Sequence, residues 1–176
     1  ALDIHQALRC GMSFDLSAAI ADRAMMHAEN AYGIAAMRIR SSLCKTNPPS
    51  NTAFRGFGGP QGVLGMERVI DDIAAYLGID PFLVRQRNFY PDKQDMENGK
   101  TTPYGQPVTD CIIGALTTKL AADADYQKRR AEIEQWNENN PILRRGIALT
   151  PVKFGISFNK TMLNQAGALV HIYTDG

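Results

Sequence analysis

The sequence has little of what a disulfide framework or a zinc site needs. Its 176 residues include only three cysteines and three histidines. They are widely separated, at Cys10, Cys44 and Cys111 and at His5, His27 and His171. No Cys-x-x-Cys pair occurs, and no cysteine–histidine spacing suits zinc. These absences exclude a disulfide scaffold and indicate reduced thiols, so we expect a cytoplasmic protein.

Net charge and long apolar runs are lacking as well. Lys and Arg number 19 and Asp and Glu 18, which gives a formal net charge of +1. This balance excludes the broad basic surface that binds nucleic acid or an anionic membrane. No apolar run approaches the roughly 18–20 residues that span a bilayer. We therefore expect neither a nucleic-acid nor a membrane partner, and a hydrophobic fraction of 44% indicates a folded globular chain.

The two ends of the sequence indicate an excised piece. The chain opens on Ala1 rather than Met, without the basic flank and apolar core of a signal peptide. It closes on alternating apolar residues that run into Asp175-Gly176, a strong hairpin signal whose second strand is missing. We expect residues 1–176 to be a single domain that is an internal fragment of a longer protein.

Periodicity and end signals predict the secondary structure. Helices are predicted at 15–30 (capped by Ser13 or Asp15), 60–77, 80–88, from 109 or 110 to 120, and from 123 or 125 to 139. Strands are predicted at 36–44, 146–154 and 168–173. Helices and strands do not alternate regularly, so the expected class is α+β, with mixed helices and short sheets.

The most unusual segment is the glycine-rich loop at 51–61, which leads into a predicted helix. Its glycines allow a backbone to approach a ligand closely, and the helix start directs N–H groups and positive potential at the loop. Arg55 adds a permanent positive charge. The pattern favours an anionic or electron-rich ligand walled by Phe54 and Phe57. The loop matches no phosphate-binding motif, so a structural plug that packs both phenylalanines inward stays an alternative.

Several segments resemble one family. The loop 52–62 (TAFRGFGGPQG) resembles the signature loop of the molybdenum hydroxylases, most closely the molybdopterin-binding domain or subunit of the xanthine dehydrogenases. Segments with the same resemblance lie at 43–47 (LCKTN), 153–158 (KFGISF), 163–169 (LNQAGAL) and 173–176 (YTDG). The resemblance covers essentially the whole chain and is weakest from about 92 to 140.

The resemblance implies a fold and an activity. The chain would be a fragment of the domain that binds molybdenum-molybdopterin, with an incomplete cofactor site. The family hydroxylates a carbon next to nitrogen in purines such as hypoxanthine and xanthine, with oxygen from water. Electrons leave through iron–sulfur clusters and FAD on other domains or subunits. The complete enzyme is expected to be oligomeric.

The resemblance also implies roles for individual residues near the cofactor. Arg55, with Phe54 and Gly56, would lie beside the cofactor, where Arg55 is near molybdenum but is not a ligand of it. Arg23 would bind an oxygen of the purine and stabilise negative charge that develops on the ring. An arginine at this position is typical of xanthine dehydrogenases rather than of the related aldehyde oxidases, so it favours a purine over a general aldehyde.

Two aromatic residues and one departure complete the implied substrate site. Phe57 would meet the substrate ring edge-on, and Phe158 would stack on its face. Asn159 stands where the family usually has a threonine that hydrogen-bonds the substrate. Asparagine offers both a donor and an acceptor, so we expect binding with altered selectivity.

The catalytic base of the family, a glutamate in a downstream Gly-Glu motif, is not in the sequence. Glu29 and Glu67 lie on predicted helices, and we expect both to be solvated rather than to replace it. The isolated chain is therefore not expected to turn over or to retain cofactor firmly. An aldehyde oxidase-like hydroxylase, a non-catalytic structural domain and an unrelated anion-binding module built on Arg55 remain alternatives.

Overall fold

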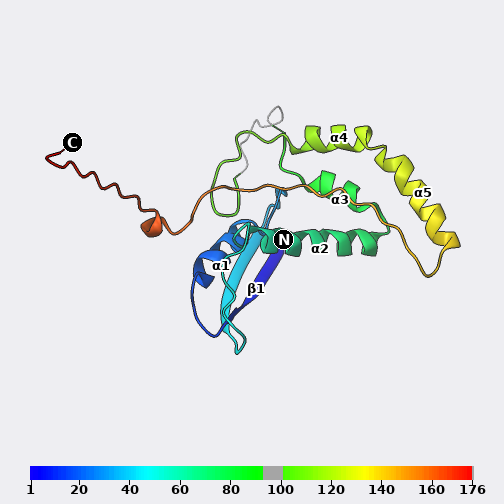
Figure 1. Ribbon diagram of the computed structural model, residues 1–176. Coiled ribbons are helices and arrows are strands. Elements are labelled where there is room, and N and C mark those ends of the chain that lie inside the picture. The colour runs from blue at the N-terminus through cyan, green and yellow to red at the C-terminus, as the bar shows by residue number, and fades with distance from the viewer. Residues whose placement is uncertain (93–100, 176) are drawn as a thin grey trace.

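The computed structural model describes residues 1–92 and 101–175, and it opens with a parallel β–α–β unit (Figure 1). Strand β1 (Leu2–Gly11) pairs with β2 (Met37–Lys45), and α1 (Ser17–Met26) connects them. The strand predicted at 36–44 is confirmed as β2. Strand β1 was not predicted, although its residues alternate between half-buried and exposed along most of its length. The α+β class is confirmed.

Helix α1 is shorter at both ends than the predicted helix at 15–30. Its N-cap is Leu16 and no side chain caps it, so neither of the expected caps acts. Asp15 has a left-handed backbone (φ +41°), and the Ser13 hydroxyl pairs with the Ser50 hydroxyl. Residues 27–30 form turns rather than helix. The chain after α1 can therefore present side chains in directions that a helix would not allow.

Helices α2 (Gly59–Leu77) and α3 (Pro81–Asn88) confirm the predictions at 60–77 and 80–88. Helix α2 lies between two glycines with left-handed backbones, Gly58 (φ +99°) and Gly78 (φ +64°). The Asp80 carboxylate accepts a hydrogen bond from the Phe82 N–H (2.8 Å) and so caps α3.

Helix α4 (Ile113–Asp123) begins later than the sequence signals indicated. Helix α5 (Tyr126–Asn139) follows directly after Asp125, one of the two residues that were expected to open it. Ile112 is the N-cap of α4 and makes no side-chain cap bond. The Asp92 carboxylate accepts hydrogen bonds from the N–H groups of Gly114 and Ala115 instead, both at 3.1 Å. A residue about 20 positions upstream thus caps this helix through tertiary structure. None of the helices in the described ranges is long and apolar enough to cross a membrane.

Two clusters of buried side chains hold the helices together. One lies between the sheet, α2 and α3, and its buried members are Tyr32, Met66, Ile70, Ala74 and Val84. The other joins α3 to α5 and to the chain that follows α5, with Phe82, Tyr126 and Leu149. The second cluster draws the C-terminal part of the chain back onto the helices.

The strands predicted at 146–154 and 168–173 are wrong for the residues that the structure describes. Residues 141–160 run as an extended chain across the helices, η2 (Thr161–Leu163) follows, and the rest leads away from the body (Figure 1). Alternating apolar residues favour extended backbone, but a strand also needs a partner, and none of the described residues pairs with these segments. The predicted hairpin turn ends at Gly176, which lies outside the described residues.

Two glutamates that were expected in solvent are buried. The Glu67 carboxylate accepts hydrogen bonds from Arg85 (2.7 Å), Asn30 (2.8 Å) and Tyr32 (2.5 Å). Glu29 is fully buried and forms an ion pair with Lys153. Burial raises the pKa of the Glu29 carboxyl, and its Lys153 partner opposes that shift. The expectation failed because the partners come from α3 and from a segment more than 120 residues away.

Candidate functional site

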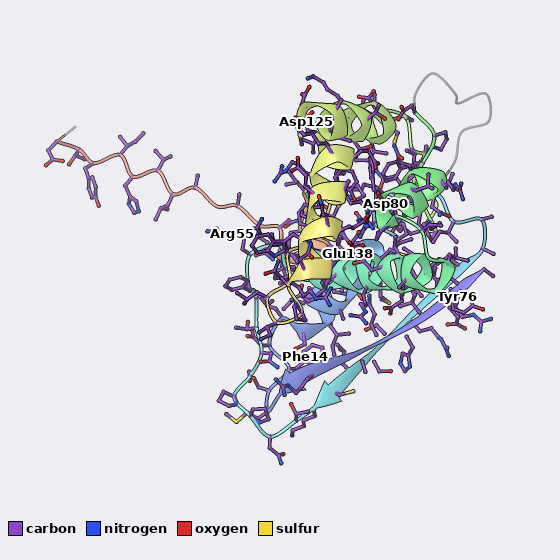
Figure 2. The ribbon with its side chains drawn as sticks, turned by 90° about the vertical axis from the view of Figure 1, so that its right-hand side faces the viewer. Phe14, Arg55, Tyr76, Asp80, Asp125 and Glu138 are labelled. Carbon is purple, nitrogen blue, oxygen red and sulfur yellow. The ribbon has the colours of Figure 1, made fainter. Side chains whose placement is uncertain are left out.

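The glycine-rich loop lies at the start of α2, at the opposite end of this helix from Tyr76 (Figure 2). Left-handed backbones at Gly56 (φ +87°), Phe57 (φ +51°) and Gly58 turn the chain into the helix. Phe54 is 83% exposed and Phe57 is half-buried. This geometry contradicts the plug alternative, in which both phenylalanines would pack inward.

The loop fits an anionic ligand. No side chain caps the N-terminus of α2, so the positive end of the helix dipole is not neutralised by a cap. Few N–H groups are free there, because Pro60 has none and the Gly59 N–H donates to the Gly56 carbonyl oxygen (3.0 Å). Arg55 is exposed, and within residues 1–92 and 101–175 its side chain makes no hydrogen bond or ion pair. A planar guanidinium beside an uncapped helix start is a donor set for phosphate and other oxyanions.

Arg23 is almost fully buried, at 7% exposure, and joins this loop to the C-terminal segment. Its Nε–H donates to the Gly56 carbonyl oxygen (3.3 Å), and its terminal nitrogens donate to the carbonyl oxygens of Gly155 and Ser157. The guanidinium carbon also lies 4.9 Å from the centre of the Phe154 ring. These bonds use three of the five N–H donors that an arginine has.

Phe57 and Phe158 are in contact, with ring centres 5.3 Å apart and planes tilted by 54°. The Asn159 amide nitrogen, next along the chain, donates to the Ala19 carbonyl oxygen on α1 (3.0 Å). The Asn159 Oδ1 atom is buried and has no hydrogen-bond partner among the described residues. It is therefore a free acceptor beside the aromatic pair.

The structure brings most of the residues singled out from the sequence together. Arg23, Gly56, Phe57, Phe158 and Asn159 converge from α1, the loop and the C-terminal segment. Phe54 and Arg55 lie on the exposed part of the same loop.

The sequence reasoning missed His27, which lies one helical turn after Arg23 on the same face. Its Nε2 accepts a hydrogen bond from the Gly155 N–H (3.0 Å), and its Nδ1–H donates to the Arg23 carbonyl oxygen (2.8 Å). A backbone N–H can only donate, so Nε2 carries the lone pair and the ring is neutral. Burial lowers the pKa of His27, and the charges of Arg23 and Lys153 lower it further. The i, i+4 spacing of Arg23 and His27 was the available signal.

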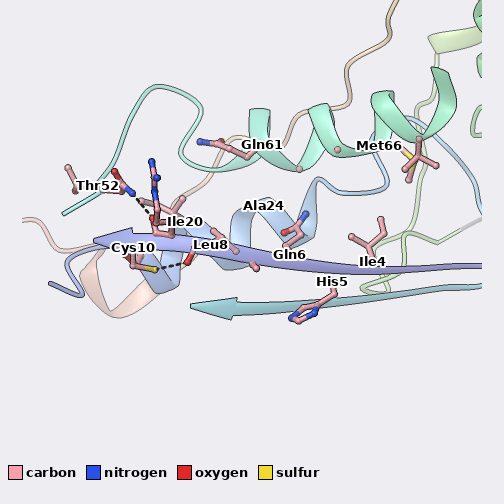
Figure 3. A pocket seen from close by; sticks show the side chains of 17 residues that line it. Ile4, His5, Gln6, Leu8, Cys10, Ile20, Ala24, Thr52, Gln61 and Met66 are labelled. Atoms are coloured by element: carbon pink, nitrogen blue, oxygen red, sulfur yellow. Dashed lines mark hydrogen bonds between the residues drawn. The ribbon is translucent and has the colours of Figure 1, made fainter. Parts of the chain in front are cut away.

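One sizeable cavity does not coincide with the predicted site. It has a volume of about 650 Å³ and lies between β1, α1 and α2 (Figure 3). Thr52 and Gln61, near the two ends of the loop, belong to its lining, whereas Arg23, Arg55 and Phe158 do not. Its lining mixes aliphatic side chains with polar ones, among them Gln6, Arg9 and Asn51.

Metal ligands and disulfides are not supplied by the described part of the chain. No group of three or more His, Cys, Asp or Glu side chains there is placed to hold a metal ion. Cys10, Cys44 and Cys111 are all free thiols, as the sequence predicted.

Curated relatives match the whole chain. A xanthine dehydrogenase from Dictyostelium discoideum is 42% identical over 176 residues, which cover 100% of this chain and 12% of that protein. Xanthine dehydrogenase 1 from Arabidopsis thaliana is 44% identical with the same coverage. Xanthine dehydrogenase/oxidase from Mus musculus is 42% identical, over 100% of this chain and 13% of that protein. The chain thus spans about an eighth of the length of these relatives.

Solved structures share the fold. The aldehyde oxidoreductase from Desulfovibrio desulfuricans has a TM-score of 0.63 and 27% identity, over 74% of this chain and 14% of that chain. The CO dehydrogenase from Oligotropha carboxidovorans has a TM-score of 0.65 at 20% identity, over 77% of this chain and 17% of that chain. The second likeness concerns the fold alone.

Two family models, each described as "Molybdopterin cofactor-binding domain", match residues 1–89 and 119–176. The first covers more than half of the chain, and the second includes the segment that carries Phe158 and Asn159. The chain therefore belongs to the family of molybdopterin cofactor-binding domains.

Proposed function

We propose that the chain forms the substrate-facing part of a molybdenum hydroxylase that oxidises oxo-purines such as hypoxanthine and xanthine. The observation that carries this proposal is the convergence of Arg23, Phe57 and Phe158 from three separate segments. Two aromatic rings and a guanidinium are the groups that a flat ring with carbonyl oxygens requires. The curated relatives that match over the whole chain are named xanthine dehydrogenases, which supports the purine.

The residues for the cofactor are those of the exposed loop. Arg55 and the positive end of the α2 dipole would hold an anionic group of molybdopterin, and Gly56 would allow close approach of the backbone. When bound, the molybdenum cofactor supplies the redox centre at which a ring carbon next to nitrogen gains a hydroxyl group from water. The chain contributes binding and orientation.

The substrate would be held by the aromatic pair and by two polar groups. Phe158 would stack on the face of the ring and Phe57 would meet its edge. Two N–H donors of Arg23 are not used by its three backbone partners and would stabilise negative charge on a purine oxygen. The free Oδ1 of Asn159 would accept a hydrogen bond from a ring N–H.

Other functions would lie elsewhere in a longer protein. We propose that residues 1–176 act as one domain of it and that the catalytic base, the iron–sulfur clusters and FAD reside on other domains or subunits. The assembled enzyme would be oligomeric and cytoplasmic. The isolated chain would not turn over, because a general base must lie within hydrogen-bond reach of the group that it deprotonates.

The test is metal, pterin and activity analysis of the complete protein. We expect molybdenum and molybdopterin in the purified protein, and hydroxylation of xanthine or hypoxanthine. The substitution Arg23→Met should lower kcat/KM for purines by about 10²–10³-fold, the range for loss of one charge-stabilising donor, and should affect aldehydes much less. A complete protein that contains no molybdenum would refute the enzyme proposal.

Aldehyde oxidation is the second candidate, because the aldehyde oxidoreductase structure shares this fold at 27% identity. The same assay separates the two. Equal losses on purines and aldehydes in Arg23→Met would contradict the role of Arg23 in purine recognition and favour the aldehyde.

A further inference from the structure

An extended segment without a strand partner forms one wall of the site. Within the described ranges, residues 151–160 pair with no strand, so their backbone groups need other partners. Helix α1 and the turn after it supply them. Asn30 Nδ2 donates to the Pro151 carbonyl oxygen (2.9 Å), and Asn30 Oδ1 accepts from the Lys153 N–H (3.0 Å). His27 and Arg23 hold Gly155 and Ser157.

These contacts follow a regular order. Along α1 and its turn, the contacting residues are Ala19, Asp22, Arg23, His27, Glu29 and Asn30. Ala19 and Asp22, near the start of α1, contact Asn159 and Lys160. From Arg23 on, the partners descend in the sequence: Ser157 and Gly155, Gly155 again, Lys153, and then Lys153 and Pro151. The segment thus runs antiparallel to α1 and the turn after it, and contacts from both replace a neighbouring strand. We call Arg23, His27 and Asn30 the α1 clamp.

His27 is the centre of the clamp. Its Nε2 holds the Gly155 N–H, and Arg23 holds the carbonyl oxygen of the same residue, so both backbone polar groups of Gly155 are fixed. The His27 ring also packs on Phe154, with centres 4.8 Å apart. The Phe154 ring in turn lies against Gly59, where a β-carbon would come within 2.4 Å of it. The clamp is therefore packed tightly against the start of α2.

Gly155 lies three residues before Phe158, and Arg23 connects the same segment to Gly56, next to Phe57. The relative position of the two aromatic rings therefore depends on the clamp and not on a sheet. A shift of the backbone at Gly155 would move Phe158 away from Phe57.

We propose that His27 is a positioning residue for substrate binding: by holding the Gly155 N–H, it sets where Phe158 lies relative to Phe57. The inference rests on the proposed function, because it assigns the stacking surface to that substrate site. His27 itself touches neither substrate nor cofactor in this assignment. Its effect should therefore appear in KM and in ligand affinity rather than in kcat.

Two substitutions in the complete enzyme separate the two hydrogen bonds of His27. Gln places an amide oxygen near the Nε2 position and can accept from Gly155, whereas Asn reaches only the Nδ1 position and leaves the Gly155 N–H unpaired. We expect His27→Asn to raise KM for xanthine about tenfold, the equivalent of one lost hydrogen bond or stacking contact, with kcat nearly unchanged. His27→Gln should keep KM within about threefold of the wild type.

A binding measurement gives a readout besides activity. Calorimetric titration with uric acid, a flat oxo-purine with no ring carbon left to hydroxylate, should show the same order: wild type and His27→Gln similar, His27→Asn about tenfold weaker. Asp22→Asn is the matched control, because Asp22 also contacts the segment from α1 but through a partly exposed ion pair with Lys160. Its KM and affinity should not change.

Equal KM values in the Asn and Gln variants, or an unchanged KM in His27→Asn, would overturn the positioning role. If His27→Asn fails to accumulate, the KM of His27→Gln is the deciding measurement. A KM for xanthine that is raised tenfold or more in His27→Gln refutes the proposal. Failure of the proposed function has a different signature. In that case the wild-type enzyme itself neither oxidises xanthine nor binds uric acid.

Discussion

Gly62 of α2 lies directly against the carbonyl oxygen of Ala24 on α1. A β-carbon at residue 62 would come within 2.2 Å of that oxygen, and one at Gly58 within 2.1 Å of the Ile20 carbonyl oxygen. The two helices therefore approach each other at backbone distance, which only glycine permits here. This contact fixes α1, with Arg23 on it, relative to the loop at the start of α2.

Gly62→Ala should destabilise the complete protein by about 1–3 kcal/mol, since the added methyl group forces the two helices apart. Gly65→Ala, one turn later in α2, is the matched control because nothing lies within 4 Å of a β-carbon there. Its expected effect is a gain of up to about 1 kcal/mol from helix propensity. Denaturant unfolding measures both, and a loss of the same size in the two variants would contradict the close contact.

Arg85→Met should be strongly destabilising. Arg85 is 1% exposed and donates to both Glu67 and Asp71 at 2.7 Å. Its removal leaves the buried Glu67 carboxylate without its cation, which costs about 3–5 kcal/mol. The control is Arg68→Met, because Arg68 forms an exposed i, i+4 pair with Asp72 that contributes less than about 1 kcal/mol. Thermal or denaturant unfolding measures the loss of stability in both variants. Equal losses would show that the buried Arg85–Glu67 pair does not contribute more to stability than the exposed pair.

Stability should fall as the pH is lowered below the ordinary pKa of histidine. Because the pKa of His27 is lowered in the folded state, the unfolded chain binds a proton at a higher pH than the folded chain does. The contribution of neutral His27 to the free energy of unfolding is fully present above about pH 6.5. Below that pH it declines by at most about 1.4 kcal/mol per pH unit, until the pH reaches the pKa of His27 in the folded state.

Other groups titrate in the same range, so the measurement is a difference. Unfolding free energies between about pH 7.5 and 5.5 are compared for wild type and His27→Gln, which cannot titrate. The wild type should lose more stability on acidification. A parallel pH dependence in the two proteins would show that His27 is not held neutral.

Arg55→Ala should lower the molybdopterin content of the purified complete protein. Loss of one charge-assisted hydrogen bond should weaken the affinity for molybdopterin about 10–100-fold. The unfolding free energy should stay within about 0.5 kcal/mol, because the side chain is exposed. Arg87→Ala, another exposed arginine, serves as control. Full cofactor content in Arg55→Ala would contradict the placement of Arg55 beside the cofactor. If the substitution abolished binding of inorganic phosphate but left the cofactor content unchanged, the loop would be an anion site unrelated to molybdopterin.

Local sequence signals predicted the helices well where the cause is local. The end of α2 at Gly78 and the start of α3 at Asp80 agree with the predicted ranges, because each of these residues acts within a few positions of its own. The signals failed where the cause is distant. Asp92 caps α4 from across a loop, and Arg85 on another helix makes Glu67 a buried residue. Neither partner can be deduced from the residues next to the affected one.

The candidate site shows the same division. The loop geometry at Gly56 and Gly58 and the exposed Arg55 follow from the glycine pattern itself. Arg23 and Phe158 entered through the resemblance to the molybdenum hydroxylases, because no local signal places a helix arginine beside a residue 135 positions later. His27 was not singled out, because its partner is the backbone N–H of Gly155. Every residue except proline has such a group, so the sequence does not indicate which one His27 binds.

The clamp has a consequence for the order in which the molecule folds. The contacts of Arg23, His27 and Asn30 with the C-terminal segment join residues 121 to 134 positions apart, whereas β1 and β2 pair across about 35. Closing such long loops is slow and follows the formation of local structure. The β–α–β unit and α2 can therefore assemble early during synthesis, while the wall that carries Phe158 is added only after α5 has folded and the chain has turned back. A ribosome-bound chain that ends before residue 150 would have its helices and no site.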